Sequence, residues 1–266
     1  MKSRSVSVVL AIPMLVLLLL PLIALLSASR PDTLVQGVRH PLFWQALGLS
    51  LSTATVSVCL VVLLGTPLSL WMARKETRVS RAVQQLVLIP IVLPPAVVGL
   101  ALLHAFAPSG VLGASLGALG IQIPFTPMAV VLAQTTIAAP FYVHAATLGF
   151  RRIDPQFVIV GETLGLSKRQ TFRRIVMPLA LPSLISGAAL TWARAMGEFG
   201  ATLLFAGNLP GTTQTMPLAI YMALESDVRV SIALAVVLAA VCVMVLAVAQ
   251  LLVPHGGLSS IIGRRR

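Results

Sequence analysis

The stretch RRIDPQFVIVGETLGLSKRQTFRRIVMP, residues 151–178, is a polar interval between two long apolar blocks. Asp154 followed by Pro155 is typical of a helix N-cap with proline at the first helical position, where its missing N–H costs nothing. Gly165 is expected to close this helix, because glycine adopts the left-handed conformation without a steric penalty. The sequence therefore predicts one short helix ending at a glycine corner.

A second short helix is expected directly after the corner. Ser167 and Gln170 have the spacing of a capping box, in which each side chain bonds the backbone N–H of the other residue. Phe172 and Ile175 would share one apolar face, and Pro178 is expected to end the helix. Both helices are shorter than the roughly 12 to 15 residues that an isolated helix needs in water. Either they lie on a bilayer surface, or they insert into a partner protein.

The composition indicates a membrane protein. Of the 266 residues, 58% are hydrophobic and only 10% are charged, whereas soluble proteins average about 25% charged residues. Six apolar blocks approach the roughly 20 residues that a transmembrane helix requires. We therefore predict an all-α polytopic membrane protein with blocks at about 6–26, 44–73, 83–107, 127–150, 179–206 and 228–253.

The apolar run at the amino terminus resembles a signal peptide because Lys2 and Arg4 precede it. The run extends from Val6 to Leu26, which is longer than the roughly 7 to 15 residues of a signal-peptide core. We interpret it as a retained first span. Residues 1–43 are thus expected to hold this span and an outer connection.

The distribution of basic residues predicts the orientation. The net charge is +12, and most of the 19 Lys and Arg residues lie in alternate gaps between the apolar blocks. The positive-inside rule places these gaps in the cytoplasm. Both termini, the 151–178 interval and a basic tail at 254–266 are therefore expected to be cytoplasmic. A charge confined to such gaps indicates a membrane surface and no nucleic acid.

Two blocks contain signs of interior helices. The second block carries hydroxyl side chains near its outer half, which favours contact with other helices over contact with lipid. The third contains Pro90, Pro94 and Pro95, and freed backbone carbonyls in a bilayer need protein or water around them. We expect a kinked interior helix there. The uncharged segment 108–127 is interpreted as an outside connection.

The fifth block contains two charged residues deep in an apolar stretch. Arg194 and Glu198 stand at i, i+4, so they share one helical face. Charges at that depth normally face a cavity or each other. Two interpretations stay open: a structural ion pair, or direct contact of Arg194 with a transported anion.

The segment that follows is dense in uncharged hydrogen-bonding groups, and a helix at 218–225 is too short to span. Its polar side chains could line a transport route or form an ordinary capped turn. The residues concerned are Thr212, Thr213, Gln214 and Thr215.

No enzymatic or metal-binding motif is present in the sequence. It contains no G-x-S-x-G, no H-E-x-x-H and no G-x-x-x-x-G-K-[ST]. His104 and His144 have no acidic or cysteine neighbour at ligand spacing, so packing histidines are expected. Cys59 and Cys242 lie inside apolar blocks as small hydrophobic side chains. We therefore expect no catalytic residue, metal or cofactor in this chain, and an intramembrane enzyme is disfavoured.

The helical corner resembles the cytoplasmic coupling loop of permease subunits of bacterial ABC importers. That pattern is E-A-A, three residues, Gly, nine residues, Ile, one residue, Leu-Pro. Gly165, Ile175 and Pro178 match it, whereas Met177 replaces the leucine and Ile159 stands where the family has its acid. The resemblance implies a type I ABC importer permease fold in which this loop contacts an ATPase. It assigns the ATPase coupling to Val160, Gly161, Glu162, Gly165, Phe172, Ile175 and Pro178.

A second resemblance covers residues 192–221. WARAMGEFGAT, FAGNLPG and TQTMPLAIY are similar to the molybdate-type permeases and their sulfate relatives. Together the two resemblances cover about 44–253, which is expected to be the permease core. They imply a homodimer, separate ATPase subunits that use ATP and Mg²⁺, and a periplasmic or extracellular binding protein that delivers an oxyanion.

Molybdate or tungstate is the expected substrate, with sulfate or thiosulfate as the alternative. The expected location is the bacterial inner membrane, in contact with lipid. A passive anion channel would also explain the spans, but not two capped helices with apolar faces outside the membrane.

Overall fold

The computed structural model describes residues 2–29, 31–39, 41–74 and 77–252, all of whose regular elements are helices. Side chains are described from residue 11 onward, except at positions 33, 36 and 252. The predicted tail at 254–266 lies outside the described residues. The long helices are α1 (Lys2–Ala28), α3 (Pro41–Arg74), α4 (Arg78–Val92), α7 (Pro127–Arg151), α10 (Met177–Met196) and α13 (Val228–Leu252). Shorter helices are α2 (Pro31–Arg39), α5 (Pro95–Phe106), α6 (Gly113–Ala118), α8 (Pro155–Thr163), α9 (Lys168–Thr171), α11 (Gly200–Ala206) and α12 (Met216–Ser226).

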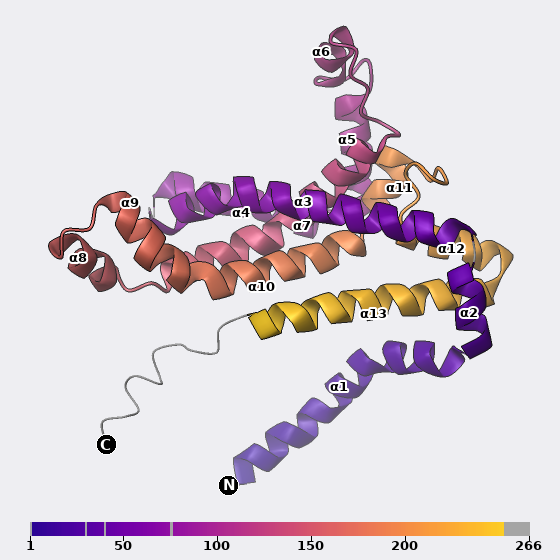
Figure 1. Cartoon of the computed structure of the whole chain (residues 1–266), viewed down its shortest axis with the longest axis horizontal. Helices are drawn as coiled ribbons and strands as arrows, with labels where there is room; N and C mark the ends of the chain where they lie inside the picture. Colours follow the sequence, from indigo (N-terminus) through magenta and orange to yellow (C-terminus); the bar gives the residue numbers. More distant parts are fainter. Residues whose placement is uncertain (1, 30, 40, 75–76, 253–266) are drawn as a thin grey trace.

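The six predicted blocks correspond to membrane-spanning candidates within the described residues. Five are helices long and apolar enough to cross a membrane, and α4 with α5 forms a sixth, bent candidate. Helices α3, α7 and α10 lie side by side at the centre, with α13 beside α10 and α1 outermost (Figure 1). Helix α7 is the most enclosed span: 56% of the residues in its most apolar 18-residue segment are buried. The expected all-α membrane architecture is therefore confirmed.

The centre of the bundle is packed around α7. One core cluster joins α3, α7 and α10 and includes Met72, Tyr142 and Phe150. Polar side chains of α3 also face inward, as expected for an interior helix: Ser57 donates to the carbonyl of Val131 at 3.1 Å and to the side-chain amide oxygen of Gln134 at 3.2 Å. Hydrogen bonds between spans satisfy hydroxyls that lipid could not.

The third block is broken, not merely kinked as predicted. Helices α4 and α5 meet at an angle of 108°. Leu93 and Pro94 each precede a proline, which disfavours helical backbone angles, and both are extended, with ψ of 138° and 134°. As a result α5 and α6 project sideways from the bundle (Figure 1).

The fifth block also differs from its prediction. Helix α10 ends at Met196, ten residues before the expected boundary at Ala206, and the short helix α11 follows. Gly197 occupies the C-cap position, where the helical hydrogen-bond ladder stops. The predicted short helix after residue 217 is confirmed as α12.

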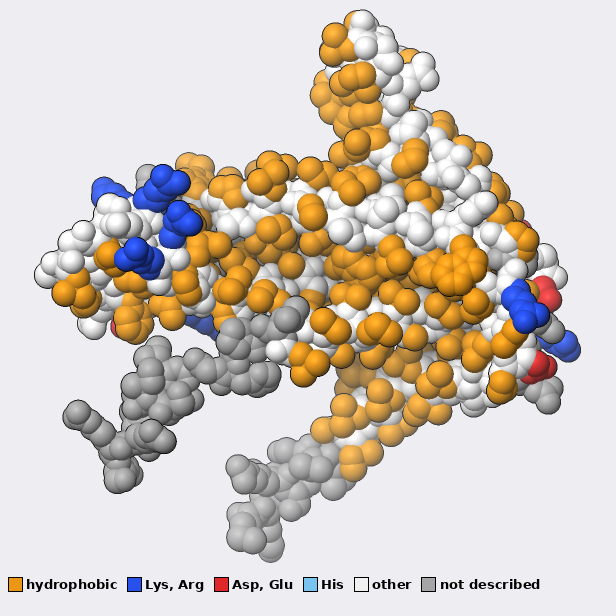
Figure 2. All heavy atoms as spheres, in the orientation of Figure 1, with side chains coloured by type: hydrophobic (Ala, Val, Ile, Leu, Met, Phe, Trp, Pro, Cys, Tyr) orange, Lys and Arg blue, Asp and Glu red, His pale blue; other side chains and the backbone are white. Residues whose placement is uncertain are grey.

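Charged side chains gather at opposite ends of the bundle. Figure 2 shows Lys and Arg around α8, α9 and the α3–α4 junction, and a smaller mixed group at the other end. We call the first the basic end. Asp227, Glu225, Arg39 and Arg229 belong to elements at the opposite end. The long apolar surfaces between the two ends have the arrangement expected of a protein that spans a bilayer.

Candidate functional site

Helix α8 is built by the capping signals expected from the sequence. The Asp154 side chain accepts a hydrogen bond from the backbone N–H of Gln156 at 2.9 Å, and Pro155 begins the helix. Gly165 has φ +86° and follows the last residues of the helix. Its N–H bonds the carbonyl of Glu162, and the next N–H bonds that of Gly161, both at 3.0 Å. These two bonds form a Schellman motif, so the predicted glycine corner is confirmed.

The capping box that opens the next helix is also confirmed. Ser167 accepts from the N–H of Gln170, whose side chain accepts from the N–H of Ser167 at 2.8 Å. The predicted end at Pro178 is wrong, however. Helix α9 continues through a π-helical segment, η1 (Phe172–Val176), directly into α10.

The π turn explains why Pro178 does not stop the helix. In a regular α-helix a proline ring collides with the carbonyl four residues earlier, which here belongs to Arg174. The N–H of Met177 instead bonds the carbonyl of Phe172, five residues back, and the wider turn gives the ring room. Lys168–Met196 is therefore one helix of 29 residues.

The apolar residues of the corner divide into an inner and an outer set. Phe172 and Ile175 were expected on an uncovered face, but Phe172 packs against the central core cluster and Ile175 lies under Gly161. A Cβ at Gly161 would be 2.6 Å from Cδ1 of Ile175, so a larger residue there would require the end of the Ile175 side chain to move.

The outer set belongs to α8 and to Leu164, its C-cap residue. The exposed apolar side chains are Phe157, Ile159, Val160 and Leu164, at 40%, 61%, 56% and 79% exposure. Our interpretation of the sequence identified Val160 alone among them. The i, i+3, i+7 spacing of Phe157, Val160 and Leu164 could have revealed this face.

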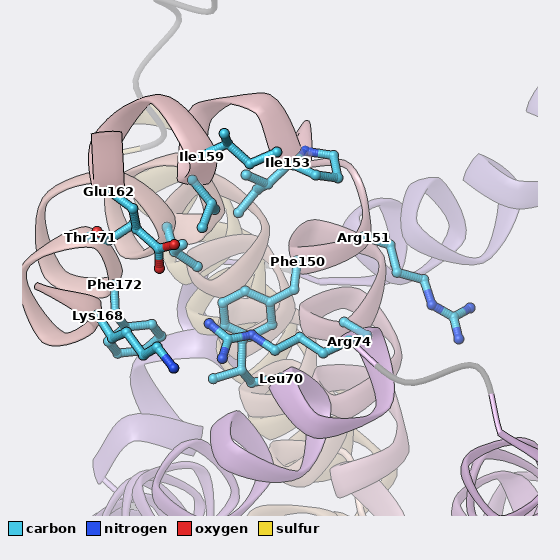
Figure 3. A pocket seen from close by; sticks show the side chains of 14 residues that line it. Leu70, Arg74, Phe150, Arg151, Ile153, Ile159, Glu162, Lys168, Thr171 and Phe172 are labelled. Carbon is cyan, nitrogen blue, oxygen red and sulfur yellow. The ribbon is translucent and has the colours of Figure 1, made fainter. Parts of the chain in front are cut away.

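A pocket of about 690 Å³ separates α8 from the ends of α3 and α7. Its walls include Leu70, Phe150 and Ile159. Figure 3 shows Arg74 and Lys168 extending into it, whereas Arg151 extends away, donating to the carbonyl of Met72 at 3.4 Å. Glu162 lies on the wall beside α9. The pocket separates part of α8 from the bundle end, and α8 contacts the core cluster through Val158 and η1 through Gly161.

The charged pair of the fifth block lies where α10 ends. Arg194 Nη2 is 2.7 Å from Glu198 Oε2, and Glu198 is only 1% exposed. The other carboxylate oxygen accepts from the N–H of Ala201 at 2.9 Å. The same side chain therefore neutralises Arg194 and caps the first turn of α11, so the structure contains the ion pair that one of our two interpretations expected.

The polar residues before α12 form a closed turn. Thr213 accepts from the N–H of Leu209 at 3.1 Å, and Gln214 donates to Asn208 at 3.0 Å. Thr215 is 1% exposed and its hydroxyl has no partner among the described residues. Thr212 is the exposed member of the four. No described hydrogen bond or ion pair joins this turn to Arg194 or Glu198, so it has the contacts of a capped turn.

The remaining candidates have no catalytic arrangement. His104 and His144 lie on different helices and are exposed in this chain, which differs from the buried packing positions that we expected. Within the described residues, no group of three His, Cys, Asp or Glu side chains could hold a metal ion.

Comparison with known proteins identifies the family. The family model of binding-protein-dependent transport system inner membrane components matches residues 65–255. The molybdenum transport system permease protein of Mycobacterium tuberculosis is 41% identical over 88% of this chain and 89% of its own. The molybdate/tungstate transport system permease protein of Pyrococcus abyssi is 36% identical over 76% of this chain and 77% of its own.

Solved structures show the same fold. A bacterial ABC transporter that imports alginate matches with a TM-score of 0.72 at 17% identity, covering 94% of this chain and 95% of its own. The MetNI methionine ABC transporter matches with a TM-score of 0.63 at 18% identity, covering 80% and 94%. The fold is thus that of type I ABC importer permeases, and the chain belongs to the family of binding-protein-dependent transport system inner membrane components.

Proposed function

We propose that this chain is the permease subunit of an ATP-driven importer of a tetrahedral oxyanion, molybdate or tungstate. The named relatives transport molybdenum or tungstate, and they align with most of the chain. Sulfate and thiosulfate, which share the charge of molybdate and a tetrahedral shape, are the alternative. A binding protein on the outer side would deliver the anion.

The observation that carries the proposal is the exposed apolar face of α8. A face with Val160 and Leu164 more than half exposed, at a strongly basic end, needs a partner that covers it. An ATPase subunit that binds ATP and Mg²⁺ would dock there, one for each copy of a homodimer. The basic end would be cytoplasmic, by the positive-inside rule.

The continuity of α9, η1 and α10 provides a way to transmit force. Helix α8 rests on η1 through Gly161 and Ile175, and η1 continues into α10 without a break. Movement of α8 on closure of the ATPase dimer would therefore tilt α10 as a lever. In this arrangement Phe172 and Ile175 are the internal supports of the coupling corner, and Val160 and Leu164 are its contact surface.

The coupling proposal is tested with Val160→Asp and Leu164→Asp. A charge in the docking face should abolish ATPase binding, so we expect ATP-driven molybdate uptake to fall about tenfold or more. The measurements are uptake into vesicles that contain the complete transporter, and co-purification of the ATPase subunit. Val111→Asp is the control, because Val111 is 87% exposed on the distant α5–α6 connection.

Normal co-purification and uptake in both α8 variants would refute the docking site. A passive channel would conduct the anion without ATP, so uptake by the unmodified protein that is independent of ATP would favour that alternative. Competition of unlabelled tungstate, sulfate and thiosulfate with labelled molybdate identifies the substrate. Inhibition by sulfate as strong as that by molybdate would favour sulfate as the substrate.

A further inference from the structure

A groove follows the contact between α7 and α10 near the basic end. Two neighbouring hollows share Arg152 and Ser183 in their walls. One hollow is lined by Ala145, Leu148, Arg152, Pro182, Ser183 and Ser186. Ala145, Leu148 and Arg152 recur every three or four positions along α7 and its C-cap, and Ser183 and Ser186 stand three positions apart on α10, so each set occupies one face of its helix. We call this surface the α7–α10 groove.

Two glycines bring α7 and α10 close together beside the groove. A Cβ at Gly149 would be 2.5 Å from Cβ and 2.9 Å from Oγ of Ser183, so any larger residue would collide with that side chain. Gly187 similarly admits Ala145, whose Cβ would be 2.9 Å away. The two helices therefore approach closely, and Ser183 faces the hollow beside Gly149.

The serine hydroxyls of the groove are free to bind a ligand. Some hydroxyls in the spans bond a carbonyl four residues earlier, as Thr136 and Thr147 do at 2.8 and 2.7 Å. Within the described part of the chain, neither Ser183 nor Ser186 makes a hydrogen bond, and Ser186 is exposed. They leave two donors unused on a membrane helix.

The groove continues across α7 to α4. Leu148 lies in the wall of a third hollow together with Gln85 and His144. Both of these polar side chains are exposed in the chain. A polar surface over three spans is costly against lipid, so it must face water or protein.

The electrostatics of this surface suit an anion. Arg152 lies at the basic end of the groove, and the hollow with Ser183 and Ser186 has no acidic residue in its wall. Asp154 lies beside Arg152 in the wall of the second hollow only, where it caps α8 by accepting from the N–H of Gln156. Neutral hydroxyls together with one cation attract a dianion only weakly. Weak attraction suits a transport route, because the permease must release the anion.

We propose that the α7–α10 groove is the wall of a water-filled vestibule through which the transported oxyanion passes on the basic side. Ser183 and Ser186 donate hydrogen bonds to the anion, and Arg152 attracts it toward the exit. This inference rests on the proposed importer function. Along α7 the wall extends from His144 to Arg152, a length of about 12 Å. This is less than half of a bilayer core of roughly 30 Å.

The test uses single cysteines in a Cys59→Ala, Cys242→Ala background. Ser186→Cys is compared with Leu181→Cys, which lies on the same helix about 140° away and is 42% exposed. The assembled transporter is treated with two methanethiosulfonates of similar size, one carrying a sulfonate and one a trimethylammonium group. We expect Ser186→Cys to react with both reagents and Leu181→Cys with neither.

The effect of the attached charge on uptake then distinguishes a surface that lines the transport route from one that only packs against protein. The sulfonate adduct at Ser186→Cys should lower molybdate uptake about tenfold more than the trimethylammonium adduct, because a like charge repels the dianion. An unreactive Ser186→Cys, a reactive Leu181→Cys, or equal inhibition by both adducts would overturn the proposal. If the Cys59→Ala, Cys242→Ala protein shows no ATP-driven uptake, the proposed importer function fails. The reactivity of the two cysteines then still decides whether the α7–α10 groove is open to water.

Discussion

At the scale of single residues, Glu198 is a buried charge that needs both an ion-pair partner and a hydrogen bond. Its carboxylate is 1% exposed, pairs with Arg194 and caps α11 through Ala201. A buried charge is tolerated only when it is paired and hydrogen-bonded. Because one oxygen serves each partner, the end of α10 and the start of α11 are held together by one side chain.

Removal of the arginine should therefore destabilise the protein more than removal of both charges. Arg194→Ala leaves a buried unpaired carboxylate, and we expect a loss of about 3 kcal/mol, with Arg194→Ala, Glu198→Gln recovering about half. The side-chain amide oxygen introduced by Glu198→Gln would still accept from the N–H of Ala201, without a charge to bury. The measurement is the thermal unfolding midpoint of the purified protein in detergent.

The double variant is its own control, since it also lacks the guanidinium. Equal midpoints for the single and double variants would contradict the prediction, because they would mean that the unpaired carboxylate of Glu198 is no more costly than a neutral amide.

At the scale of elements, the two broken helices depend on each other. Helix α5 turns away from α4 and packs against α11, which begins where α10 stops. Gly99 is the contact point: a Cβ there would be 2.6 Å from the carbonyl oxygen and 2.7 Å from Cα of Ala201. Backbone atoms cannot move aside as a flexible side chain can, so this contact needs glycine.

Gly99→Ala should therefore separate α5 from α11. We expect a loss of about 1 to 3 kcal/mol, the usual range for overpacking a close contact. Gly48→Ala is the matched control, because Gly48 is also helical and a Cβ there would meet nothing within 4 Å. The control should be neutral or stabilised by up to about 1 kcal/mol through helix propensity.

Thermal unfolding in detergent measures both glycine variants. A Gly99→Ala protein as stable as Gly48→Ala would show that the α5–α11 contact is loose enough to absorb a methyl group.

At the scale of the whole molecule, the separation of charge predicts how the protein lies in the membrane. Thr163 is exposed beside the basic end, and Ser226 is exposed at the end of α12 on the opposite side. In the Cys59→Ala, Cys242→Ala background, a membrane-impermeant maleimide should label Ser226→Cys in intact cells. Thr163→Cys should be labelled only after permeabilisation, because the positive-inside rule puts it in the cytoplasm.

Labelling of Thr163→Cys in intact cells would invert the orientation and remove the cytoplasmic docking of an ATPase on α8. Labelling of both sites would show that the reagent crossed the membrane, and a smaller dose would then be required.

Local chemistry determined much of this protein from the sequence alone. Asp154, Gly165 and the Ser167–Gln170 box act through bonds within a few residues, so their caps were predictable and are present. Runs of apolar residues likewise predicted the spans, since burial in lipid depends on length and composition.

Only the tertiary structure decided what depends on distant neighbours. It showed that α9 continues into α10, that α4 and α5 meet at 108°, and that Phe172 faces inward while Leu164 faces out. A proline can end a helix, bend it, or be accommodated by a wider π-helical turn. An apolar side chain on a short helix can face either the bundle or the outside. Which of these occurs is set by the packing of residues far apart in the chain.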